Sequence, residues 1–147
     1  MSLGRRPFLK ATLLAATLSG LPSTLYALVK QRSLRSAAVS AHDATRAAGT
    51  LLPPGRPGFG RGVVAHLAIS MLCAETLART LPRDHRAEWG AAAGLAIGVI
   101  NVGVIGKAFP AISDLPLAPQ LADNVMFGAV FGTLLDRWDR QRDDEPT

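Results

Sequence analysis

The side chains most able to take part in chemistry stand inside long apolar stretches of this sequence. They are ionisable or carboxamide groups, namely His66, Glu75, Arg79, Asn101, Lys107, Asp123 and Asn124. An ionisable group near the centre of a bilayer costs at least roughly 2.5–3.5 kcal/mol, so each such group needs a partner or a task. The chemistry that fits this set is ion pairing, hydrogen bonding between helices, or ion and proton binding in a cavity.

Glu75 and Arg79 are four residues apart, which places them on one face of a helix. We expect an ion pair in which Arg79 reaches the membrane interface and neutralises Glu75. The alternative is that Glu75 is a protonatable site facing a cavity. His66 precedes Glu75 by nine residues, about half a turn away around a helix, so the two cannot share one site on that helix. His66 lies among small residues, where a hydrogen bond to another helix is expected.

Asn101 falls in the middle of the third apolar stretch, and we expect it to form a hydrogen bond to another helix. Asp123 falls in the first turns of the fourth stretch, where a carboxylate meets the positive end of the helix dipole. Lys107 ends the third stretch on the same side and is the expected partner of Asp123. Such a pair is a structural latch rather than a catalytic one.

No catalytic set is recognisable, because the chain shows no nucleophile with a base, no phosphate-binding loop and no paired catalytic carboxylates. The one cysteine, Cys73, cannot form an intrachain disulfide and is expected to be a small hydrophobe. A metal or haem at His66 would need further ligands, whereas His42 and His85 fall in connections elsewhere. We therefore predict a protein without enzymatic activity, cofactor or metal.

Four apolar stretches must position these groups. They run through Phe8–Val29, Gly62–Leu81, Trp89–Gly106 and Leu117–Leu135. A helix rises 1.5 Å per residue, so about 20 residues cross a hydrocarbon core of roughly 30 Å. The sequence predicts an all-α fold with one membrane domain over residues 1–138, in which four spans form a bundle. A disordered polar tail is expected over residues 139–147.

The connections add two features to this scheme. Pro22 interrupts the first stretch, and a kink is expected there because proline removes a backbone donor. Apolar residues, mostly alanine, recur at helical spacing over residues 34–51. This pattern predicts a short amphipathic helix in the membrane interface between the first two spans, packed on the end of the bundle.

Small residues recur every four positions in each stretch, which lets helix backbones approach closely in a bilayer. The positions expected to form helix contacts are Ser19, Ser70, Gly90, Gly94, Gly98, Gly128 and Gly132. These contacts can lie within one chain, between copies of a homo-oligomer or against another membrane protein, and the spacing does not distinguish between them.

The net charge of +5 and the pI near 10.3 fit a membrane surface better than a nucleic acid. Arg and Lys flank the apolar stretches, where they meet lipid headgroups. No basic surface interleaved with aromatic residues supports nucleic-acid binding. The excess of Arg over Lys and the abundance of Ala point to a bacterial source, and hence to the inner (cytoplasmic) membrane as the location.

The N-terminal segment allows two interpretations. Residues 4–10 resemble the twin-arginine export signal, Ser/Thr-Arg-Arg-x-Phe-Leu-Lys, and residues 39–41 fit a cleavage site. However, the apolar run is longer than the usual 7–15 residues of a signal peptide, which favours an uncleaved first span. Basic residues are nearly balanced between the two sides, and the leading Arg5, Arg6 and Lys10 favour cytoplasmic termini.

Thr45–Thr50, His66 and Ala122–Gly128 together resemble small four-helix bacterial inner-membrane proteins of unknown function, such as the YagU-like proteins. The resemblance extends over about residues 10–137. It implies the four-span architecture and no particular activity. Such proteins often carry histidine where this chain has Asn124.

The sequence as a whole predicts a small multi-pass membrane protein with a structural, regulatory or complex-subunit role. An alternative is a small transporter or channel component that uses Glu75, Asn101 and Asp123 along a pathway, although no pair of unwound helices is recognisable. A further alternative is an exported protein with a twin-arginine-type signal.

Overall fold

The computed structural model describes residues 5–143, and this part of the chain is helical throughout, without a strand. Two elements are not α-helices, since η1 is a short 3₁₀-helix and η2 is a π-helix. In chain order the elements are α1 (Arg5–Leu18), α2 (Leu21–Gln31), α3 (Leu34–Ala48), η1 (Gly49–Leu51), α4 (Phe59–Thr80), α5 (Arg86–Ile100), η2 (Asn101–Ile105), α6 (Gly106–Ala108), α7 (Pro110–Ser113) and α8 (Leu117–Asp143).

Three helical segments are long and apolar enough to cross a membrane: Arg6–Gln31, Phe59–Thr80 and Arg86–Ala108. These match the first three stretches expected from the sequence. α8 is the longest helix but is not among the three, because Gln120, Asp123 and Asn124 lower the mean hydropathy of its first half.

The first of these segments is broken rather than gently kinked. α1 ends at Leu18, and α2 begins at Leu21 after a turn at Ser19 and Gly20. Pro22 stands at the start of α2, where its missing N–H interrupts no helical hydrogen bond. The expected interruption of the helix is therefore present, but it lies at Ser19 and Gly20, just before the proline.

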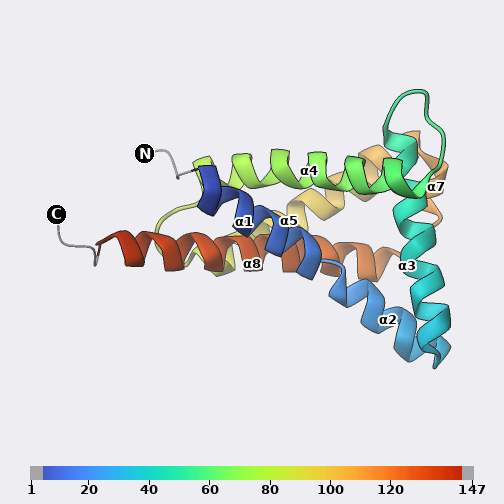
Figure 1. Ribbon diagram of the computed structural model, residues 1–147, viewed down its shortest axis with the longest axis horizontal. Coiled ribbons are helices and arrows are strands. Elements are labelled where there is room, and N and C mark those ends of the chain that lie inside the picture. Colours follow the sequence, from blue (N-terminus) through green and yellow to red (C-terminus); the bar gives the residue numbers. More distant parts are fainter. Residues whose placement is uncertain (1–4, 144–147) are drawn as a thin grey trace.

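α8 forms the centre of the molecule, with α5 along its length and α1 and α2 on another side (Figure 1). α4 packs chiefly against α3 and η1, and less extensively against α1. Most of the large buried apolar side chains come from α8, where Phe127, Phe131 and Leu135 are 7%, 0% and 2% exposed, and α4 adds Leu77 at 2%. The rings of Phe8 and Phe131 pack in a T-shaped arrangement, with 6.0 Å between ring centroids. Around these residues the interior is filled mainly by alanine from α1 and α4.

α5 and α8 approach each other so closely that their backbones touch. A Cβ added to Gly90 would lie 2.2 Å from the carbonyl oxygen of Gly128, and one added to Gly94 would lie 2.1 Å from that of Asn124. A Cβ on Gly132 would lie 2.1 Å from the carbonyl oxygen of Arg86. Only glycine fits at these positions, because real Cβ atoms do not approach other atoms so closely.

α3 crosses one end of the molecule, at a large angle to α4 and α8 (Figure 1). The Ser33 side chain caps its start by accepting a hydrogen bond from the backbone N–H of Ser36. α3 and η1 together cover residues 34–51, the range expected for the helix between the first two spans. Ala37 and Ala47 face the interior at 2% and 9% exposure, and a Cβ on Gly62 of α4 would collide with the backbone of Thr45.

The expectation of a disordered tail from residue 139 onward is wrong for residues 139–143, because α8 continues to Asp143. Two ion pairs support this extension: Asp139 lies 2.8 Å from Arg86 of α5, and Asp136 lies 3.2 Å from Arg140 one turn further on. The rest of the expected tail, residues 144–147, lies outside the described part of the chain.

Candidate functional site: a polar cavity near the end covered by α3

A cavity of about 230 Å³ lies in the half of the molecule nearer to α3. The break between α1 and α2, the helices α4 and α8, and the π-helix η2 form its walls, while Leu51 of η1 and Ile112 of α7 line it from the end of the molecule. Its polar lining consists of Ser19, His66, Ser70, Asn101, Gln120, Asp123 and Asn124, together with the Cys73 thiol.

Asp123 binds the start of α2. Its Oδ1 accepts a hydrogen bond from the backbone N–H of Ser23 at 2.9 Å, and its Oδ2 accepts one from the Ser23 hydroxyl. Gly20 occupies the capping position of α2 and provides no side-chain cap. Asp123 therefore fulfils the role of a helix cap from a residue 100 positions away in the chain.

A chain of carboxamides continues along the cavity wall. Asn101 Nδ2 donates to Asn124 Oδ1 at 3.3 Å, and Asn124 Nδ2 donates to the carbonyl oxygen of Gln120 at 2.8 Å. Gln120 Nε2 in turn donates to the carbonyl oxygens of Leu115 at 2.9 Å and Ile112 at 3.3 Å. These bonds connect η2 to α8, and α8 to the segment before it.

The backbone of the third apolar segment is irregular where it meets this chain. The helix widens into a π-helix from Asn101 to Ile105, and the N–H of Gly106 bonds to the carbonyl oxygen of Asn101, five residues back. Short π-turns of this kind occur frequently at functional sites. The break at Ser19 and Gly20 and the π-turn at Asn101 thus meet at one cavity. Pro22 predicted an interruption of the first stretch, whereas no sequence pattern indicated the π-turn at Asn101.

His66 lines the cavity and is exposed. Its Nε2 is 3.1 Å from the carbonyl oxygen of Ala16, so it forms the bond to another helix that its position predicts. The ring is also close enough to Asp123 for the two to interact electrostatically.

Other residues expected to be functional lie away from the cavity. Glu75 and Arg79 form an ion pair at 2.6 Å on the outer side of α4, with side chains 47% and 75% exposed. The expected pair of Lys107 and Asp123 is wrong: Lys107 is exposed and forms no ion pair among residues 5–143. Asp123 instead forms hydrogen bonds to Ser23 of α2, because the break between α1 and α2 leaves backbone N–H groups without helical acceptors.

The small residues divide into two groups. Ser19 and Ser70 are buried and line the cavity. Gly90, Gly94, Gly98, Gly128 and Gly132 lie along the contact between α5 and α8. Sequence reasoning missed Ser23, Gln120 and the cavity position of Cys73. The one available signal was that Gln120 precedes Asn124 by four residues and so shares its face of the helix.

Comparison with known proteins provides no identification, because no protein-family model, curated protein or solved structure matches the chain. The resemblance to YagU-like proteins therefore stays a prediction. Within the described residues, no three His, Cys, Asp or Glu side chains lie together as a metal site would require.

Proposed function

We propose that this chain is a small multi-pass membrane protein in which α1–α2, α4, α5–α6 and α8 cross the bilayer as one four-helix bundle. Its role in this proposal is non-enzymatic, as a structural or regulatory component or as the subunit of a membrane complex. A bacterial inner membrane is the proposed location.

The observation that carries this proposal is the distribution of side-chain size between the inside and the outside. The interior is built mainly from alanine, glycine and serine, whereas Leu25, Leu72 and Val99 on the outer faces are 57%, 68% and 56% exposed. Soluble monomers rarely expose apolar patches of this extent. In a bilayer the same faces contact lipid tails, and small interior residues let the helices pack.

α8 belongs among the proposed spans although its composition is the least apolar. Its polar residues Gln120, Asp123 and Asn124 line the cavity and do not face outward. With 27 residues the helix is about 40 Å long, enough to cross the hydrocarbon core and emerge from it.

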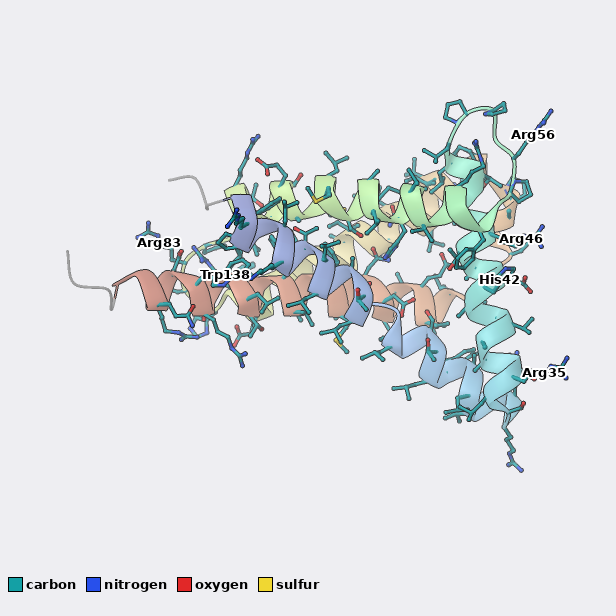
Figure 2. All side chains as sticks on the ribbon, in the orientation of Figure 1. Arg35, His42, Arg46, Arg56, Arg83 and Trp138 are labelled. Atoms are coloured by element: carbon teal, nitrogen blue, oxygen red, sulfur yellow. The ribbon has the colours of Figure 1, made fainter. Side chains whose placement is uncertain are left out.

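The polar residues at the two ends of the molecule fit this placement. Arg35, Arg46 and Arg56 extend from the end that carries α3, and Arg83 and Trp138 lie at the opposite end (Figure 2). Basic and tryptophan side chains are favoured where lipid headgroups meet water.

Membrane fractionation tests the proposal. We expect the chain to stay with the membrane during alkaline carbonate washing, to require detergent for extraction, and to show the intact mass of residues 1–147. A carbonate-soluble protein would contradict the spans, and a species beginning near His42 would instead support the exported alternative. A partner that co-purifies from native membranes would then identify the complex.

A small transporter component is a second candidate, and the cavity favours it. Discontinuous helices whose irregular backbone lines a polar cavity are a recurring design of transporter binding sites. Asn101 and Asp123 line this cavity, whereas Glu75 does not. The proposed pathway therefore includes Asn101 and Asp123 but not Glu75. Uptake of methylammonium into liposomes, compared between the wild type and Asp123→Asn, separates this candidate from a purely structural role. Uptake equal to that of empty liposomes would exclude it for this solute.

A further inference from the structure

The amides that line the cavity can be oriented from their partners. Asn124 Nδ2 lies 2.8 Å from the carbonyl oxygen of Gln120, and Gln120 Nε2 lies 2.9 Å from that of Leu115. A carbonyl oxygen only accepts hydrogen bonds, so the nitrogen of each amide must face it. Asn124 Oδ1 then accepts from Asn101, which orients the third amide as well.

This orientation leaves acceptors in excess at the cavity. Asn101 Oδ1 and Gln120 Oε1 have no partner in the described part of the chain. Every fully buried side-chain oxygen or nitrogen in the described residues has a partner. These two unpartnered oxygens are therefore not fully buried. Both residues line the cavity, which is the space that the oxygens can face. Each carboxylate oxygen of Asp123 has a further lone pair beside its bond to Ser23.

His66 and Ser70 also line the cavity. The carbonyl oxygen of Ala16 can only accept, so Nε2 of His66 donates to it. The Ser70 hydroxyl can both donate and accept. Among the residues that line the cavity, Asp123 provides the carboxylate.

The remaining walls are apolar. Ile69, Ile105, Ile112 and Phe127 line the cavity beside the polar groups. The volume of about 230 Å³ is enough for a small organic molecule rather than a single water. A ligand that matches both the acceptor-rich part and the apolar part of the lining is small, positively charged and rich in N–H donors, with a short apolar body.

We propose that the cavity is a binding site for a small protonated amine, whose ammonium group bonds to Asp123, Asn101 and Gln120 while its alkyl part contacts the isoleucine side chains. This inference rests on the helix arrangement and the cavity within it. It requires neither the proposed membrane placement nor a particular biological role. An anion is disfavoured by the carboxylate, and an alkali ion leaves the apolar walls without a partner.

Cys73 provides the measurement, because it is the one cysteine in the chain and lines the cavity. Detergent-purified wild-type protein is treated with aminoethyl, sulfonatoethyl and methyl methanethiosulfonates, and each rate is divided by that of a small free thiol in the same micelles. We expect the normalised rate for the cationic reagent to exceed that for the anionic one by about tenfold. Propylammonium chloride should slow all three reactions, whereas potassium chloride and tetramethylammonium chloride, which lack N–H donors, should not.

Two variants locate the effect. Asp123→Asn should abolish the preference for the cationic reagent, and the matched control Glu75→Gln, a carboxylate on the outer side of α4, should retain it. The wild-type competition does not depend on a variant, so the proposal stays testable if Asp123→Asn fails to fold. Equal normalised rates, a Cys73 that reacts with no reagent, or protection by potassium equal to that by propylammonium would each overturn it. Carbonate washing is independent, so failure of the proposed spans would be recognised separately.

Discussion

Where a helix begins or ends inside this protein, a single polar side chain can satisfy the backbone groups left without helical partners. The N–H of Ser23 lies in the first turn of α2, where a helix cannot satisfy its own donors. Gly20 has no side chain to cap it. Asp123 meets this need from α8, which explains why a carboxylate stands inside an otherwise apolar stretch of the sequence.

Asp123→Asn should therefore destabilise the fold by about 1–3 kcal/mol, because two bonds to a charged acceptor are lost and the N–H of Ser23 faces an amide. Thermal unfolding in detergent measures the effect. Glu75→Gln is the matched control and should change stability by less than about 1 kcal/mol, since its ion pair with Arg79 is exposed. Equal losses in the two variants would argue against the capping role.

A second residue-level prediction concerns the far end of the molecule. Arg86 is 8% exposed, and its guanidinium lies 2.8 Å from Asp139, which is one-third exposed. Arg86→Met should destabilise by about 1–3 kcal/mol, less than for a fully buried pair. Arg140→Met, which removes a similar ion pair at a side chain 69% exposed, should have little effect. The same unfolding measurement compares them, and an Arg140→Met loss as large as that of Arg86→Met would contradict burial as the cause.

At the scale of elements, the contact between α5 and α8 is the most tightly determined part of the fold. Glycines stand on both sides of it, and their carbonyl oxygens occupy the space that a Cβ would need. Close backbone approach of this kind is how helices associate where burial of apolar surface gives little advantage.

Gly94→Leu should separate α5 from α8 and lower stability by at least about 3 kcal/mol, because the new side chain would overlap the backbone of Asn124. Gly103→Leu is the control, since nothing lies within 4 Å of a Cβ at that position. Melting temperatures in detergent should differ clearly between the variants. Equal melting temperatures would show that the two helices are not held by this contact.

At the scale of the whole molecule, the two halves differ. Around Phe131 and Leu135 the interior is closed, whereas toward α3 it contains the cavity, with its polar and apolar lining. The start of α1 and the end of α8 lie at the closed end (Figure 1). The four proposed spans would place this end and the 81–85 connection on one side of the membrane, and the leading basic residues favour the cytoplasm for it.

Cysteine labelling tests this orientation in a Cys73→Ala background. Single cysteines at Asp84 and Ala38, both exposed, report the two ends of the molecule. In intact cells a membrane-impermeant reagent should label position 38 and not position 84. Labelling of 84 but not 38 would reverse the orientation, and labelling of both would contradict α4 as a membrane span, because α4 alone separates the two positions.

The sequence by itself determined the helical class, the three apolar helices and the helix over residues 34–51, because hydrophobic periodicity and length are local properties. It also placed the Glu75–Arg79 pair, since four-residue spacing on one helix fixes that contact. Only the tertiary structure decided that Asp123 binds Ser23 rather than Lys107, that η2 widens at Asn101, and that these features surround one cavity. The physical reason is that these choices depend on which unsatisfied backbone groups the packing brings opposite each side chain, and no local pattern records that.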